Sequence, residues 1–194
     1  MFAPLFNCHL QSHIAAVNQG VKSIVLIGMM GAGKSSVGRC LERRTGLTRF
    51  DTDEVVASKF GLSIPEIFSR YGGDRFREME TQVLTEFTSA EPVIIVTGGG
   101  TVLREENVTL LKQAGIVVWL DAEEETLFER ASRRGNRPLL KTDNPRAAFS
   151  QILHERAPLY SKAADLRVNT TAATHEEVAD LILQEIETRM IAHK

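Results

Sequence analysis

The chain has 194 residues, of which 43% are hydrophobic and 25% charged, as is usual for a globular domain with a full-sized core. Lys and Arg number 23 against 25 Asp and Glu, so the formal net charge is −2. This balance disfavours a dedicated nucleic-acid binder, because such proteins carry a basic excess. The composition also excludes a collagen, a coiled coil and a disordered chain, and no apolar run approaches the roughly 20 residues of a membrane-spanning helix.

Residues 1–22 are predicted to form an N-terminal extension to a single domain over 23–194. Polar residues interrupt its apolar stretch and it has no positively charged start, so a secretory signal is not expected. His9 and His13 are four residues apart, but no third ligand is near, which favours surface histidines over a metal site. The only cysteines are Cys8 and Cys40, which we interpret as free thiols in a reducing cytoplasm.

In chain order, the hydrophobic pattern predicts strands alternating with helices. The predicted elements are strand 23–27, helix 33–45, strand 47–50, helices 53–60, 64–71 and 74–88, strand 92–96, helix 105–113, strand 115–120, helices 123–133 and 145–157, strand 165–168 and helix 174–190. Three of the strands are apolar throughout, which is typical of a parallel sheet covered on both faces. The alternation predicts a three-layer α/β/α fold.

Capping boxes at residues 63–66 and 174–177 are expected to begin two of these helices. The last helix is expected to present one apolar face, formed by Val178, Leu181, Ile182 and Ile186. The stretch 132–146 is basic and contains Gly, Asn and two Pro, so we predict a mobile loop there.

The strongest local signal is Gly-Met-Met-Gly-Ala-Gly-Lys-Ser at residues 28–35, between a predicted strand and a predicted helix. In such a loop, backbone N–H groups curl around phosphate oxygens and the helix N-terminus adds its positive dipole end. We expect Lys34 to bridge the β- and γ-phosphates of a nucleotide and the Ser35 hydroxyl to bind Mg²⁺, although the loop alone does not separate a kinase from a GTPase, a motor or a switch protein. The predicted nucleotide-binding residues of this loop are Gly31, Ala32, Gly33, Lys34, Ser35 and Ser36.

Two predicted strands end in aspartate. Asp121 precedes helix 123–133 and is expected to cap it. Asp51 and Asp53 are carboxylates two positions apart, which suits two tasks: one can hold metal-bound water while the other points at an acceptor hydroxyl. An equally weighted alternative makes Asp53 the N-cap of helix 53–60.

Six motifs follow one another along the chain. They are the phosphate loop at 28–35, Asp-Thr-Asp at 51–53, Phe-Arg at 76–77, Gly-Gly-Gly at 98–100, Arg-Pro-Leu-Leu at 137–140 and Arg-Ala-Pro-Leu-Tyr at 156–160. Their order and gaps resemble those of the shikimate kinases, over nearly the whole chain from about Ile24 to the final helix.

This resemblance implies a P-loop kinase fold of the nucleoside-monophosphate-kinase type, with five parallel strands in the order 2-3-1-4-5. It also implies a substrate-binding segment at about 53–80 and a lid at about 132–146. The implied reaction is MgATP plus shikimate giving shikimate 3-phosphate and ADP, a step towards chorismate and the aromatic amino acids.

The resemblance implies roles for the residues around the substrate. Arg77 and Arg156 are expected to bind the carboxylate of shikimate, for which a planar guanidinium is suited. Asp53 would meet the ring hydroxyls as catalytic base, and Glu80 would orient Arg77 from position i+3. The glycines of the triplet, which would let the backbone approach a hydroxyl, are Gly98, Gly99 and Gly100.

On the nucleotide side, Arg137 is expected to act from the lid as a catalytic residue on the phosphates, and Arg130 to lie near the adenine. Metal binding is assigned to Ser35 and, through water, to Asp51. The loop 169–174 has no long basic side chain, so contacts to the base are expected to come mainly from the backbone.

Alternative functions stay open. A kinase for another small hydroxy acid, such as gluconate, has a related fold, although two arginines at the carboxylate positions favour shikimate. A nucleotide-binding protein without catalysis is disfavoured because the Lys, Ser, Asp and Arg residues of the motifs are all present. We expect a cytoplasmic monomer that binds only small molecules, with no nucleic-acid or membrane partner.

Overall fold

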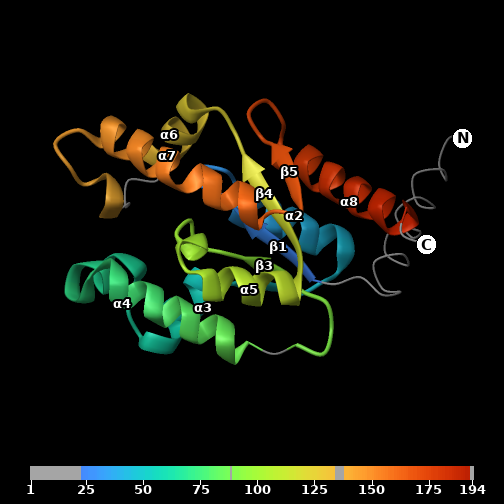
Figure 1. The fold of residues 1–194 in the computed structure, drawn as a ribbon, viewed down its shortest axis with the longest axis horizontal. Helices are drawn as coiled ribbons and strands as arrows, with labels where there is room; N and C mark the ends of the chain where they lie inside the picture. Colours follow the sequence, from blue (N-terminus) through green and yellow to red (C-terminus); the bar gives the residue numbers. More distant parts are fainter. Residues whose placement is uncertain (1–22, 88, 134–137, 193–194) are drawn as a thin grey trace, which may run out of the picture.

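The computed structural model describes residues 23–87, 89–133 and 138–192. Its centre is a parallel sheet of five strands in the order β2-β3-β1-β4-β5, which confirms the predicted order (Figure 1). The strands are β1 (Ser23–Ile27), β2 (Arg49–Asp51), β3 (Ile94–Val96), β4 (Gly115–Asp121) and β5 (Leu166–Asn169). Every residue of β1 is buried, as the unbroken apolar run predicts for a strand with neighbours on both sides.

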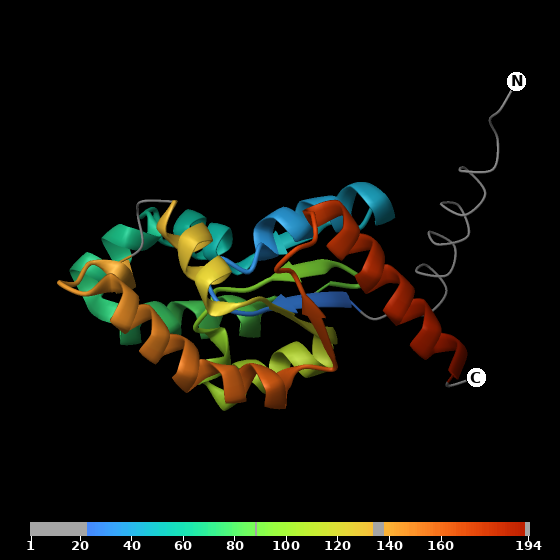
Figure 2. The same ribbon diagram turned by 90° about the horizontal axis from the view of Figure 1, so that it is seen from above.

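Helices cover both faces of the sheet (Figure 2). On one face α2 (Lys34–Thr45) packs against α8 (His175–Ala192). The other face is covered by α5 (Glu105–Ala114) and α7 (Pro145–Ala163), both of which contact β4. The three layers follow from the continuous apolar character of the strands, since both of their faces must be removed from water.

The remaining elements lie beyond the carboxyl ends of the strands. α3 (Thr52–Phe60) and α4 (Ile64–Glu86) pack against each other, and α6 (Glu124–Ser132) packs on α7 (Figure 1). Two 3₁₀ helices, η1 (Thr101–Leu103) and η2 (Pro138–Leu140), contact both α4 and α7.

The buried apolar side chains form two clusters. The large one lies between the sheet and the helices on its two faces. The second lies between α3 and α4 and consists of Val56, Ile67, Phe76, Met79 and Val83. Phe50 of β2 packs against both clusters, so it joins the α3–α4 unit to the rest of the molecule.

Both predicted capping boxes are confirmed. The Ser63 backbone N–H donates to Glu66 Oε2 at 2.9 Å and the Glu66 N–H donates back to Ser63 Oγ at 3.4 Å. At the start of α8, Thr174 and Glu177 exchange the equivalent bonds at 2.8 and 3.2 Å. The predicted helices 64–71 and 74–88 are the two halves of α4, separated by a kink at Gly72 with φ 78° and ψ 175°.

Three expectations about individual residues are wrong. The strand predicted at 47–50 begins at Arg49 and includes Asp51, which pairs with Val96 of β3. Leu181 is 44% exposed, so it does not belong to the apolar face of α8, whereas Val178, Ile182 and Ile186 are buried as predicted. Asp121 does not cap α6, because it is the last residue of β4 and its carboxylate pairs with Arg167 at 2.5 Å.

Cys40 is buried and free, as predicted. Residues 1–22, with Cys8, His9 and His13, lie outside the described residues, as does part of the predicted loop at 132–146. Within the described ranges, no helix has both the length and the apolar character needed to cross a membrane.

Gly28, directly after β1, provides a stability prediction. Its φ is 138°, and a Cβ there would lie 2.3 Å from the Leu120 carbonyl oxygen. We expect Gly28→Ala to lower the free energy of unfolding by roughly 3 kcal/mol, since backbone strain of about 1–2 kcal/mol adds to steric overlap of about 1–3 kcal/mol. Urea unfolding would measure the change.

The matched control is Gly46→Ala. Gly46 has a φ of 73°, but a Cβ there has no neighbour within 4 Å. This variant should therefore lose only the strain part, about 1–2 kcal/mol. Equal losses in the two variants would contradict the assignment of a steric contact between Gly28 and β4.

Candidate active site

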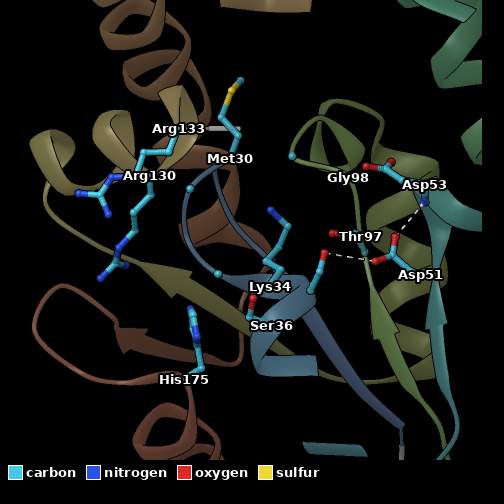
Figure 3. Close-up of a pocket in the computed structure, with 14 residues that line it drawn as sticks. Met30, Lys34, Ser36, Asp51, Asp53, Thr97, Gly98, Arg130, Arg133 and His175 are labelled. Atoms are coloured by element: carbon cyan, nitrogen blue, oxygen red, sulfur yellow. Dashed lines mark hydrogen bonds between the residues drawn. The ribbon is translucent and has the colours of Figure 1, made fainter. Parts of the chain in front are cut away.

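The phosphate loop connects the buried strand β1 to α2, as its sequence predicts, and lines one side of a cavity (Figure 3). Lys34 Nζ donates hydrogen bonds to the carbonyl oxygens of Gly28 at 2.7 Å and Met29 at 3.2 Å. Gly31, Gly33, Ser35 and Ser36 also line the cavity. Ala32 does not line the cavity, because this loop residue is buried.

Asp51 lies across the cavity from the loop, at the end of β2 (Figure 3). Its Oδ2 accepts a hydrogen bond from Ser35 Oγ at 3.3 Å, and its Oδ1 accepts from the Asp53 N–H at 3.2 Å. Asp51 is therefore the N-cap of α3, and the alternative that Asp53 caps this helix is wrong. The Asp53 side chain therefore does not form this cap.

Arg49 is a site residue that the sequence analysis missed. Its guanidinium binds Asp51 Oδ2 at 3.1 Å and Glu54 at 2.8 Å, and its side chain is only 14% exposed. Burial raises the pKa of the Asp51 carboxyl and the charge of Glu54 acts in the same direction, while the charge of Arg49 opposes both. Residues two apart on a strand share a face, so the spacing of Arg49 and Asp51 was a usable signal.

A second cavity adjoins the first, and Asp53 lines both. Phe68 and Phe76 form an apolar wall of the second cavity, with ring centroids 4.8 Å apart. Leu139 of η2 and the glycines Gly98, Gly99 and Gly100 complete much of the lining. A Cβ on Gly98 would lie 2.9 Å from Asp53 Oδ1, so the close approach of these two residues requires glycine.

Both predicted carboxylate-binding arginines line this second cavity. Arg156 is buried, and its guanidinium donates to the Gly99 carbonyl at 3.1 Å. The Tyr160 hydroxyl donates to the same carbonyl at 2.5 Å, and burial raises the pKa of Tyr160 to about 12, so it stays a neutral donor. Arg77 is more exposed and pairs with Asp74 at 2.8 Å.

The structure does not give Glu80 the predicted role of orienting Arg77. The Glu80 carboxyl is buried next to Gly98, where its hydrogen-bond partners include Thr52 and Thr101. Burial raises the pKa of Glu80 to about 7, and the nearby charge of Asp53 contributes to the rise.

The far end of the first cavity, away from Asp53, is lined by Arg130, Arg133 and His175 (Figure 3). Arg130 donates to the carbonyls of Thr170 at 3.0 Å and Thr171 at 3.1 Å, so it holds the loop before α8 in place. The sequence analysis did not single out His175, although it directly follows the capping Thr174. Arg137 lies outside the described residues.

A phosphate loop between a central parallel strand and a helix, with an acidic pair where another strand of the same sheet ends and a second cavity beside it, defines a P-loop phosphotransferase. The family model for shikimate kinase matches residues 30–187. The chain therefore belongs to the shikimate kinase family, whose members are kinases that use ATP.

Individual relatives agree with this assignment. The chain is 44% identical over 167 residues to a shikimate kinase of Thermodesulfovibrio yellowstonii, covering 86% of this chain and 96% of the relative. It is 46% identical over 164 residues to one of a Synechococcus species, covering 84% and 81%. The structure of an Acinetobacter baumannii shikimate kinase in complex with shikimate superposes with a TM-score of 0.85 at 38% identity, covering 91% and 98%.

Proposed function

We propose that this enzyme transfers the γ-phosphoryl group of ATP to the 3-hydroxyl of shikimate, with ATP in the first cavity and shikimate in the second. The observation that supports this arrangement best is the position of Asp53, which lines both cavities. A hydroxyl beside this carboxylate would lie between the acceptor ring and the phosphate loop, where an in-line transfer requires it.

The lining of the second cavity fits the chemistry of shikimate. Arg77 and Arg156 offer guanidinium groups to a carboxylate. Phe68 and Phe76 offer apolar contact to the ring. At the other end, Asp53 and the Gly98 loop offer acceptors and donors to the hydroxyls.

The transfer step uses residues of both cavities. Asp53 orients the 3-hydroxyl and accepts its proton as the new O–P bond forms and the bond from the γ-phosphorus to the β,γ-bridging oxygen breaks, leaving ADP. Lys34 exchanges its loop carbonyls for β- and γ-phosphate oxygens and stabilises their negative charge. We also propose that Arg137 acts on the phosphates and that Arg130 lies near the adenine.

Ser35 and Asp51 fit the Mg²⁺ that the reaction needs. Their oxygens face each other at 3.3 Å, and hydroxyl and carboxylate oxygens are the ligands that Mg²⁺ prefers. Among the described residues, no cluster of three or more His, Cys, Asp or Glu could hold a metal ion. We assign Ser35 as a direct ligand and Asp51 as a ligand through water. When bound, Mg²⁺ would neutralise phosphate charge.

The assay that tests the function is ADP release from MgATP with shikimate, with gluconate and with other hydroxy acids. We expect stimulation by shikimate alone. Stimulation by gluconate instead would establish the rival acceptor. Binding of ATP without stimulation by any acid would establish a nucleotide-binding protein that has lost catalysis.

Arg156→Ala should raise the KM for shikimate about 30-fold, because a buried charged hydrogen-bonding group is worth roughly 2 kcal/mol or more. The KM for ATP should change little. The Gly99 carbonyl keeps its bond from Tyr160, so the loop should stay folded. Steady-state kinetics would measure the effect, with Arg189→Ala on the exposed surface of α8 as control; an unchanged KM would remove Arg156 from the carboxylate site.

We also propose that the enzyme is a cytoplasmic monomer. The free, buried thiol of Cys40 suits a reducing compartment. The large apolar side chains exposed in the described structure are Tyr71, Leu103, Leu181 and Ile191, which come from three different elements. Light scattering on the purified protein would measure the mass in solution.

A further inference from the structure

The Glu80 carboxyl is buried directly behind the acceptor cavity and does not line it. It connects three segments: Thr52 at the start of α3, Gly98 after β3, and Thr101 in η1. A Cβ on Gly98 would lie 2.8 Å from Glu80 Oε1, which shows how closely the glycine loop, residues 98–100, approaches this carboxyl. Because Gly98 lines both cavities, Glu80 is placed to control the loop that the acceptor meets.

The hydroxyl of Thr101 has two possible acceptors but only one proton. It lies in hydrogen-bond contact with Glu80 Oε1 and at 2.9 Å from the Gly98 carbonyl oxygen. If Glu80 is ionised, Thr101 must donate to the carboxylate, and the Gly98 carbonyl keeps only the longer bond from the Thr101 N–H at 3.4 Å. If Glu80 is protonated, it donates to Thr101, whose own proton then serves Gly98.

Hydrogen bonds from Thr52, Thr101 and the Gly98 backbone lower the pKa of Glu80, but two other features of its environment favour a neutral carboxyl. Glu80 Oε2 is buried and has no hydrogen-bond partner within the described structure, and no ion pair of the described residues involves Glu80. A carboxylate in that position would be costly, whereas a neutral carbonyl oxygen without a partner costs less.

The charged and titratable groups around Glu80 come from α3, α4 and α7. Asp53 adds a negative charge from α3, and Tyr160 of α7 stays neutral. Arg77 lies one turn earlier on α4 and pairs with Asp74, and Arg156 of α7 binds the Gly99 carbonyl. These arginines are engaged with other partners, so the nearest charge effect on Glu80 that the structure shows is repulsion from Asp53.

We propose that Glu80 is a positioning residue that acts in its neutral form: it donates to Thr101, Thr101 donates to the Gly98 carbonyl, and this chain of bonds fixes the glycine loop for the acceptor. Ionisation of Glu80 turns the Thr101 hydroxyl away from Gly98 and loosens the loop. The inference rests on the proposed placement of shikimate in the second cavity.

The first test compares pH profiles of wild type and Glu80→Gln. A glutamine amide donates to Thr101 as the neutral acid does, but it cannot ionise. In wild type, kcat/KM for shikimate should fall by about tenfold per pH unit above the Glu80 pKa, mainly through KM. In Glu80→Gln this fall should disappear, while activity near pH 6 stays within about threefold of wild type. Glu78→Gln, an exposed glutamate on the same helix, is the control and should keep the fall.

Three outcomes of these pH profiles would contradict the proposal. A Glu80→Gln enzyme that keeps the alkaline fall, or that is inactive near pH 6 although folded, would show that Glu80 works as a carboxylate. A wild-type profile without an alkaline fall would also overturn the proposal.

A second measurement needs neither turnover nor a folded variant. Infrared spectra of the wild-type protein near pH 6 should contain the carbonyl band of a buried carboxylic acid, which should vanish at alkaline pH as Glu80 ionises. The absence of this band would overturn the neutral form. If the band is present but shikimate stimulates no ADP release, the proposed function fails while the protonation of Glu80 stands.

Discussion

Replacing Lys34 with alanine is expected to lower kcat for shikimate phosphorylation by about 10³-fold, the size of effect seen when one preorganised donor to transition-state charge is removed. The ammonium group is the only side-chain cation of the phosphate loop, and the loop's N–H groups alone cannot replace its charge at the transferred group. The coupled assay for ADP release at saturating MgATP and shikimate would measure the loss.

The fold should survive this substitution. Lys34 bonds the Gly28 and Met29 carbonyls at the edge of an open cavity, where water can replace it. Thermal unfolding should therefore stay close to that of wild type. Lys162→Ala, at a lysine that is 79% exposed, is the control and should leave kcat unchanged. Turnover retained by a folded Lys34→Ala enzyme would rule out the assigned role of this lysine.

Asp53→Asn is expected to lower kcat by about 10²–10⁴-fold, the usual contribution of a positioned proton acceptor. The asparagine can still contact the 3-hydroxyl but cannot take its proton. The KM for ATP should change little, because the nucleotide is held by the loop and by α2. Steady-state kinetics with each substrate varied in turn would separate these effects.

The Asp53→Asn variant should keep the stability of the wild-type protein. Asp51 provides the cap of α3, so Asp53→Asn should leave the free energy of unfolding within about 0.5 kcal/mol of wild type. Asp180→Asn, in an exposed ion pair with Arg44, should change neither kcat nor stability appreciably. A loss of stability without a loss of kcat in Asp53→Asn would return this residue to a structural role.

Local patterns predicted the nucleotide side of the site well. The phosphate loop is a short sequence pattern set between a strand and a helix, and both capping boxes depend on residues three apart. The kink at Gly72 was also visible, as the gap between two predicted helices. In each case the interacting groups are close in the sequence, so local chemistry decides the structure.

The acceptor side depended on contacts that the sequence does not display. Glu80 bonds Thr52 and Thr101, which are 28 and 21 positions away, instead of a neighbour on its own helix. Whether Asp51 or Asp53 caps α3 depends on where β2 ends. Pairing with β3 extends β2 to Asp51. Leu181 is exposed because the buried face of α8 is set by its packing on α2 and β5.

The small cluster between α3 and α4 gives the enzyme two units of unequal stability. Five buried side chains, with partly buried apolar ones packed around them, form the core of this unit, whereas the sheet and the phosphate loop belong to the much larger cluster. The helices around the acceptor can therefore open locally at a free energy well below that of global unfolding. Binding of the acid adds contacts to the weaker unit and so shifts its equilibrium towards the closed form. Substitutions that alter the choice of acid can accumulate in α3 and α4 without weakening the part that holds the nucleotide.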